Sequence, residues 1–300
     1  IDPYDIAVCT ELEDDGAGSW APAAPPIVQT SLFTYPTLEA LVDAFAAEHK
    51  NPLYTRGQNP TVAILERKLA ALERGEACKA FASGMAAVSA VMLGLLRSGD
   101  HVLFVNQTYG PTLQLASRLR RFGVEHDLLL DTDVESVARA LRPNTKLVWL
   151  ESPGTMTFQV LDIPAIAALA RDHGAITCID NSWATPLFQK PITLGVDVVV
   201  HSATKYIGGH SDVVAGAVIT TAERMQEIFY GAFLLNGGIL GPFDGWLLLR
   251  GLRTLPVRMR QHHEDALRVA EFLVGHPAVR RVLHPAFAED RALVERQLAG

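Results

Sequence analysis

A lysine and two hydroxyl residues come directly after an apolar run in the stretch VVHSATKY, residues 199–206. The run has the composition of a buried strand, and Ser202, Thr204 and Lys205 stand at its end. A lysine amine can form a Schiff base with an aldehyde, and hydroxyl groups can donate hydrogen bonds to a phosphate. This segment is therefore the first candidate for chemistry.

Two other apolar runs also end in polar residues. One ends in Glu151-Ser152-Pro153 and the other in Asp180-Asn181. Ligands of open parallel sheets bind outside the carboxyl ends of the strands, so we expect these ends and Lys205 to face one crevice. A simple ion pair between Asp180 and Lys205 is the alternative interpretation.

Further residues extend the candidate site. Ser83-Gly84-Met85 precede an apolar helical pattern, and a helix N-terminus attracts phosphate. Tyr109 follows another apolar run and offers an aromatic face. A phosphate cup, a carboxylate, a lysine and a ring together suit pyridoxal 5′-phosphate (PLP). This cofactor binds a lysine through its aldehyde and needs a carboxylate at its ring nitrogen.

The elements that would position these residues alternate between strand and helix. Apolar runs rich in valine and isoleucine predict strands at 101–105, 145–151, 175–180 and 196–202. Helices are predicted from Asn59 to Gly75 and from about Pro164 to Gly174. This alternation predicts an α/β fold with a mainly parallel sheet covered by helices on both faces.

Changes in composition and in the predicted secondary structure along the chain suggest three regions. Residues 1–50 are interpreted as an irregular N-terminal arm, residues 51–242 as a PLP-binding large domain, and residues 243–300 as the start of a smaller C-terminal domain. The third region is expected to hold long helices followed by a strand at 279–284.

Composition excludes several classes of protein. The formal net charge is −7, and nothing in the sequence suggests the basic face that nucleic-acid binding requires. Three distant cysteines give neither a disulfide framework nor zinc spacing, and they favour the cytoplasm. We expect no membrane segment and no signal peptide. We also expect no metal site, because His262 and His263 lie in a charged helical pattern.

Several blocks carry a resemblance to a known family. SATKYIGGHSDVVAG, YTRGQNPT, ASGMAA, TYGPT, CIDNSWATP and GPFDGWLLLRGLRTLPVRM resemble, in the same order, blocks of the Cys/Met-metabolism (trans-sulfuration) family of PLP-dependent enzymes. The resemblance covers nearly the whole chain. It implies the PLP-dependent transferase type I (aspartate-aminotransferase-like) fold, with a smaller C-terminal domain only partly present.

The resemblance also implies roles for single residues. Lys205 would be the Schiff-base lysine and the base that takes the Cα proton, Asp180 the partner of the ring nitrogen, and Tyr109 the residue stacked on the ring. The phosphate would be held by a set of small and hydroxyl residues: Ser83, Gly84, Met85, Ser202 and Thr204. Tyr54 and Arg56 would reach the phosphate of a neighbouring subunit.

The implied assembly is a homo-oligomer, as a dimer of dimers (homotetramer), with a small sulfur-containing amino acid as substrate. Family members extend beyond the point that corresponds to residue 300, and the arginine that binds the substrate carboxylate would lie there.

Different motifs in the sequence point to different types of reaction. ESPGTM (151–156) and YGPT (109–112) resemble the cystathionine β-lyase branch, which predicts β-elimination to homocysteine, pyruvate and ammonia. GPFDGWLLLRGL (241–252) resembles the γ-enzymes, so cystathionine γ-synthase, cystathionine γ-lyase or methionine γ-lyase chemistry is the alternative. A catalytically incomplete PLP-binding scaffold is a further alternative.

Overall fold

The computed structural model describes residues 6–7, 22–288 and 290–298. Contacts divide the chain into two compact units. Unit 1 comprises 1–95 and 201–254, and unit 2 comprises 96–200 and 255–300. The units do not share the predicted boundaries at residues 50 and 242, so that division stays a prediction. Residues 1–5 and 8–21 of the predicted arm, with its Cys9, lie outside the described residues.

Unit 2 contains a parallel sheet with strand order β6-β5-β4-β2-β3. Its strands are β2 (His101–Val105), β3 (Glu125–Leu129), β4 (Thr145–Glu151), β5 (Ile176–Asp180) and β6 (Val198–His201), of which the last residue, His201, is counted with unit 1. Its main helices are α5 (Gly110–Leu119), α6 (Val134–Ala140), α7 (Ile163–His173), α8 (Thr185–Phe188), α12 (Leu255–Val274) and α13 (Arg291–Leu298).

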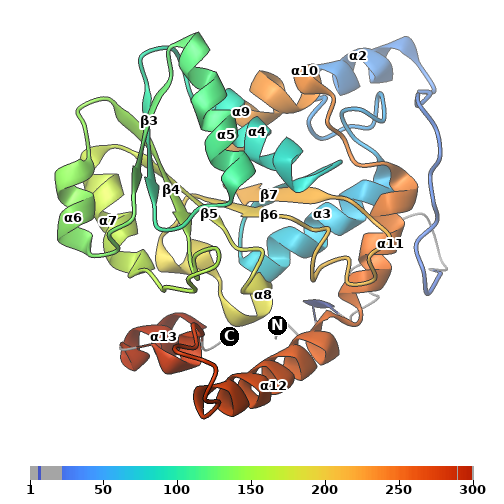
Figure 1. The fold of residues 1–300 in the computed structure, drawn as a ribbon. Helices are drawn as coiled ribbons and strands as arrows, with labels where there is room; N and C mark the ends of the chain where they lie inside the picture. Colours follow the sequence, from blue (N-terminus) through green and yellow to red (C-terminus); the bar gives the residue numbers. More distant parts are fainter. Residues whose placement is uncertain (1–5, 8–21, 289, 299–300) are drawn as a thin grey trace. The chain divides into compact units, whose positions relative to one another are not determined.

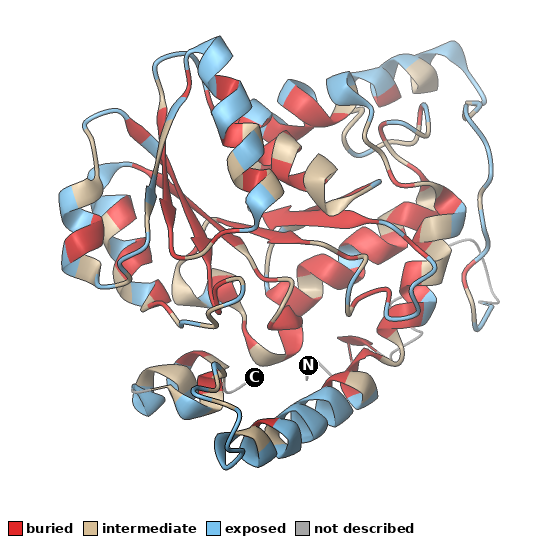
Figure 2. Ribbon diagram, viewed as in Figure 1, coloured by how far each residue is buried: buried red, intermediate tan, exposed pale blue. Residues whose placement is uncertain are grey.

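The inner strands of unit 2 are largely buried, whereas β3 at its edge has no buried residue. Every residue of β2 is buried, as are most residues of β4, including Trp149 (Figure 2). Helix α5 connects β2 to β3, which is a step in one direction along the sheet. Helices α6 and α7 connect β3 to β4 and β4 to β5, which are steps in the other direction (Figure 1). Right-handed crossovers therefore place α5 on the opposite face from α6 and α7. The expected parallel sheet flanked by helices is confirmed.

Helix α7 shows why the local prediction succeeded. The Asp162 side chain accepts a hydrogen bond from the Ala165 N–H at 3.2 Å, which satisfies one free donor of the first turn. At the other end, Gly174 adopts the left-handed conformation at φ 84°. Both ends lie within two residues of their predicted positions.

Unit 1 contains an antiparallel strand pair, β1 (Ala77–Phe81) and β7 (Gly216–Thr220). Helices α3 and α4 pack on opposite sides of β7 (Figure 1). The helices of this unit are α2 (Leu38–Ala46), α3 (Pro60–Glu73), α4 (Gly84–Leu95), α9 (Ala222–Ile228), α10 (Leu234–Asn236) and α11 (Pro242–Leu252), with a π-helical turn at Phe229–Phe233.

The predicted stop of α3 at Gly75 needs correction. Asn59 caps the start as expected, but Arg74 is the residue that adopts the left-handed conformation, at φ 63°. Gly75 is required for space instead, because a Cβ atom there would overlap the Ile219 side chain. The helix therefore ends one residue earlier than predicted.

Two further expectations were wrong. The arm is not wholly irregular, because α2 forms within it with the Thr37 hydroxyl accepting from the Ala40 N–H at 3.1 Å. Residues 279–284 form no strand, since none of the described strands pairs with them, and a strand needs a partner for its backbone groups. No helix among the described residues is long and apolar enough to cross a membrane.

Candidate active site

Two carboxylates end neighbouring strands in unit 2. Glu151 is the last residue of β4 and Asp180 the last of β5, and the two are paired in the sheet register. Asp180 Oδ1 accepts a hydrogen bond from the Ser182 N–H at 2.9 Å. Asn181 instead points into the protein, where its side-chain amide pairs with Gln189. The structure therefore leaves Asp180, half-buried at the strand end, as the carboxylate available to a ligand.

Glu151 connects this strand end to Tyr109. Glu151 Oε2 accepts from the Tyr109 N–H at 2.9 Å, and the Thr155 hydroxyl donates to Oε1. Tyr109 lies just before α5 and is half-exposed, at 50%. Burial and then the neighbouring Asp180 charge raise the pKa of Glu151 to about 7. The sequence pointed to the position of Glu151 but not to this positioning role.

The raised pKa of Glu151 predicts a pH-dependent stability. Between its usual pKa of 4.5 and about 7, the folded protein binds more protons at this group than the unfolded chain does. The free energy of unfolding should therefore fall as pH rises through this range, by up to about 3 kcal/mol. Urea unfolding of the cofactor-free protein at pH 5 to 8 measures this change.

The matched variant is Glu151→Gln, which keeps an acceptor for the Tyr109 N–H but cannot ionise. It should lose this part of the pH dependence, whereas Glu135→Gln, at an exposed position in α6, should retain it. An unchanged slope in Glu151→Gln would show that Glu151 is ionised in the folded protein throughout the range.

In unit 1 the start of α4, at Ser83 and Gly84, lies against Ser202, the residue that follows β6. Ser83 Oγ accepts from the Ala86 N–H at 3.0 Å and so caps α4. A Cβ atom on Gly84 would lie 3.0 Å from both Cβ and Oγ of Ser202. Glycine is thus the residue that lets the start of α4, half-buried Met85 included, approach Ser202 this closely. The structure brings together four of the five residues predicted to hold a phosphate.

The fifth, Thr204, uses its hydroxyl within the loop. Thr204 Oγ1 accepts from the Ala215 N–H at 2.9 Å and donates to the Ala215 carbonyl at 3.1 Å. In this arrangement it fixes the loop that carries Lys205. The Lys205 N–H donates to the Ser202 carbonyl at 3.1 Å, and the Lys205 side chain is exposed.

A buried pair that sequence reasoning did not identify holds the start of this loop. His201 Nε2 lies 2.5 Å from Glu73 Oε1, and both side chains are almost fully buried. His201 directly precedes Ser202, and Glu73 is the last residue of α3. The only sequence signal was the position of His201 beside the lysine loop.

Tyr54 and Arg56 lie together on an exposed turn of unit 1. The Arg56 guanidinium lies 5.4 Å from the centroid of the Tyr54 ring. The Gly57 N–H donates to the Tyr54 carbonyl at 2.8 Å, which closes the turn. The two predicted residues are therefore presented to solvent as a pair.

These features fit PLP on chemical grounds. The N-terminus of α4, with its positive dipole, lies next to Ser202, and such a helix start suits a phosphate. Burial is the main cause of the raised pKa of Glu151 and the Asp180 charge is the second, and a protonated ring nitrogen beside Asp180 would offset that second contribution. Lys205 supplies an exposed amine close in sequence to the phosphate donors.

Comparison with known proteins identifies the class. The pattern of the family described as Cys/Met metabolism PLP-dependent enzymes matches residues 7–299. The chain belongs to this family, whose cofactor is PLP.

Two curated relatives and one solved structure are among the proteins that this chain resembles. L-methionine γ-lyase of Fusobacterium nucleatum subsp. polymorphum is 42% identical over 87% of this chain and 67% of its own length. Cystathionine γ-synthase of Mycobacterium bovis is 45% identical over 82% of this chain and 64% of its own length. The crystal structure of metB from Corynebacterium glutamicum matches 99% of this chain and 77% of its own chain, with a TM-score of 0.91 and 35% identity.

The chain thus spans about two thirds of the length of the curated relatives it matches. The fold expectation is confirmed. The preference for the β-lyase branch is not supported, because both curated relatives are named as γ-enzymes.

Proposed function

We propose that the protein containing this chain is a PLP-dependent enzyme that breaks or forms a bond at the γ-carbon of a sulfur-containing amino acid. This is the chemistry of cystathionine γ-synthase, cystathionine γ-lyase and methionine γ-lyase. The observation that carries the proposal is identity of 42% and 45% to two enzymes named for γ-reactions. The block at 241–252, which resembles γ-enzymes, agrees with it.

The glycine in ESPGTM (151–156), the segment that resembles the β-lyase branch, is explained by local packing. A Cβ atom on Gly154 would lie 2.5–2.8 Å from the side-chain amide atoms of Asn106. Asn106 is buried, with φ 73°, and its Nδ2 donates to the Glu151 carbonyl at 3.1 Å. Packing around Asn106 therefore accounts for glycine in ESPGTM, so the segment carries little weight for the β-reaction.

Each site residue has a proposed task. When bound, PLP supplies an electron sink for negative charge at the substrate Cα. The Lys205 amine takes the Cα proton and, for a γ-reaction, moves a second proton from Cβ. The Asp180 carboxylate keeps the proton on the ring nitrogen. Tyr109 would stack on the ring, and the bond from its N–H to Glu151 holds its backbone in place.

The phosphate contacts and the assembly complete the proposal. Ser83, Gly84, Met85 and Ser202 would bind the phosphate, and the Thr204 hydroxyl would join them only by leaving Ala215. Tyr54 and Arg56 would act on a neighbouring subunit of a homo-oligomer, where the planar arginine fork suits a phosphate. The substrate would be a small amino acid, and the cytoplasm remains the location that the cysteine pattern favours.

Product analysis with cystathionine tests the position of bond cleavage. We expect cysteine, 2-oxobutyrate and ammonia, formed with uptake of one water, because the Cγ–S bond breaks. A parallel reaction of an O-acyl homoserine with cysteine tests γ-replacement, with Lys205→Ala as the inactive control. Pyruvate and homocysteine from cystathionine would show instead that the β-lyase interpretation was right.

A further inference from the structure

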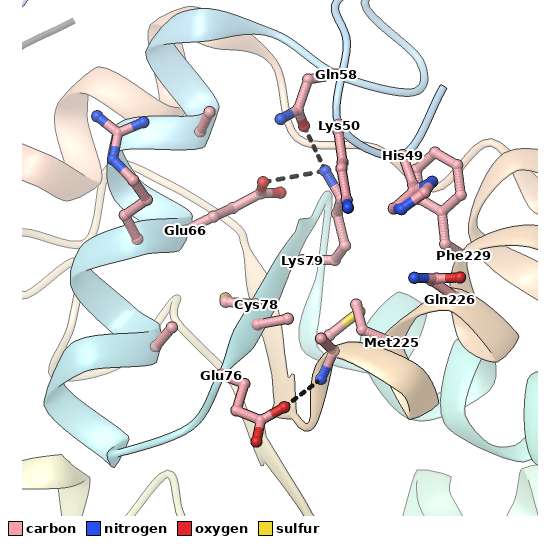
Figure 3. Close-up of a pocket in the computed structure, with 15 residues that line it drawn as sticks. His49, Lys50, Gln58, Glu66, Glu76, Cys78, Lys79, Met225, Gln226 and Phe229 are labelled. Atoms are coloured by element: carbon pink, nitrogen blue, oxygen red, sulfur yellow. Dashed lines mark hydrogen bonds and ion pairs between the residues drawn. The ribbon is translucent and has the colours of Figure 1, made fainter. Parts of the chain in front are cut away.

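A buried lysine in unit 1 lies next to the turn that presents Tyr54 and Arg56. Lys79, on β1, is only 5% exposed. It lines a cavity of about 440 Å³ together with Glu66 and Gln58 (Figure 3). A buried ammonium group is costly unless it is paired and hydrogen-bonded, so its partners show what it stabilises.

The Lys79 ammonium group binds three acceptors. Its Nζ lies 3.0 Å from Glu66 Oε2, 2.6 Å from Gln58 Oε1 and 3.3 Å from the Gly57 carbonyl. Figure 3 shows the Lys79 side chain between Glu66 and Gln58. One acceptor thus belongs to α3, whereas the other two belong to the exposed turn.

The pair is itself firmly held. Glu66 Oε1 accepts from the Ala80 N–H at 3.0 Å, so the carboxylate bonds to both the side chain and the backbone of β1. Burial raises the pKa of Glu66, and the Lys79 charge opposes that shift. The rings of Phe229 and Phe233 lie 5.5 Å and 5.4 Å from Lys79 Nζ and close the other side. The ammonium group therefore has one well-defined position.

We propose that Lys79 is a positioning residue that fixes the turn at residues 54–58, so that Arg56 is oriented to bind the cofactor phosphate. The inference rests on the proposed function of Arg56. Lys79 bonds to Gly57 and Gln58, the two residues that follow Arg56, while the Tyr54 and Arg56 side chains stay exposed. Its role is distinct from that of Lys205, because its donors are taken up inside the protein.

The experiment compares the binding of PLP and of pyridoxal, which lacks the phosphate, to the cofactor-free full-length protein. Absorbance titration gives both dissociation constants. Arg56→Ala should weaken PLP binding at least tenfold and leave pyridoxal binding within about twofold. Lys79→Met and Gln58→Leu should each weaken PLP binding about threefold to thirtyfold with the same lack of effect on pyridoxal. Gln58→Leu leaves the Lys79–Glu66 pair intact and so provides the test if Lys79→Met does not fold.

Two controls sharpen the comparison. Lys50→Met removes an exposed lysine that lines the same cavity and should bind both ligands like the wild type. The double variant Lys79→Met with Arg56→Ala should bind PLP no more weakly than Arg56→Ala alone, because Lys79 acts through Arg56.

Each contrary outcome has a separate meaning. Normal PLP binding by Lys79→Met or Gln58→Leu, beside weak binding by Arg56→Ala, would overturn the inference and leave the proposed function standing. Equal weakening of PLP and pyridoxal, or additive effects in the double variant, would show a general structural role and also overturn it. Normal PLP binding by Arg56→Ala would refute the proposed role of Arg56 and the inference with it.

Discussion

Asp180→Ala should lower kcat by roughly a hundredfold to a thousandfold, since removal of one preorganised electrostatic group typically costs about 3–4 kcal/mol of transition-state stabilisation. Without the carboxylate, the ring nitrogen would lose the partner that keeps it protonated, and charge at Cα would lose its main stabilisation. Turnover at saturating substrate, with the PLP content of each preparation measured by absorbance, checks the prediction.

The controls for Asp180 separate charge from fold. Asp172→Asn changes an exposed acidic residue of α7 and should leave kcat unchanged. Asp180→Glu keeps a carboxylate and should recover part of the lost rate. A PLP-loaded Asp180→Ala variant with near-normal kcat would contradict the proposed role of this carboxylate.

Lys205→Ala should show the largest loss, more than about a thousandfold in kcat, because it removes both the amine that binds the cofactor and the proposed base. Lys205→Arg keeps the positive charge but cannot give up its proton, so it should be equally inactive. Added methylamine should restore part of the rate in Lys205→Ala and none in wild type. Lys146→Ala, at an exposed position of β4, is the matched control. Substantial turnover in Lys205→Arg would contradict proton transfer by Lys205.

Local signals in the sequence were sufficient for much of the fold. The strands at 101–105 and 145–151 were placed correctly because their apolar runs are nearly continuous, as burial on both faces of a parallel sheet requires. Helix α7 was placed by Pro164 and Gly174, whose effects are local. The carboxylates at the ends of β4 and β5 followed from the rule for parallel sheets.

Features that depend on distant partners could not be predicted in this way. Gly75 looked like a helix stop, but its role depends on Ile219, which is far away in the sequence. The strand expected at 279–284 lacked a pairing partner among the described strands. The Lys79–Glu66 and His201–Glu73 pairs join residues that no sequence spacing connects. Roles such as the contact of Glu151 with Tyr109 therefore became visible only in three dimensions.

The central claim is that Lys205 carries the cofactor, and covalent labelling tests it most directly. The PLP-loaded protein is reduced with borohydride, digested and mapped by mass spectrometry, with the unreduced protein as control. We predict a single phosphopyridoxyl group on the peptide that contains SATKYIGG, at Lys205. A label on Lys79, a buried lysine of unit 1, or on any lysine other than Lys205 would contradict the account.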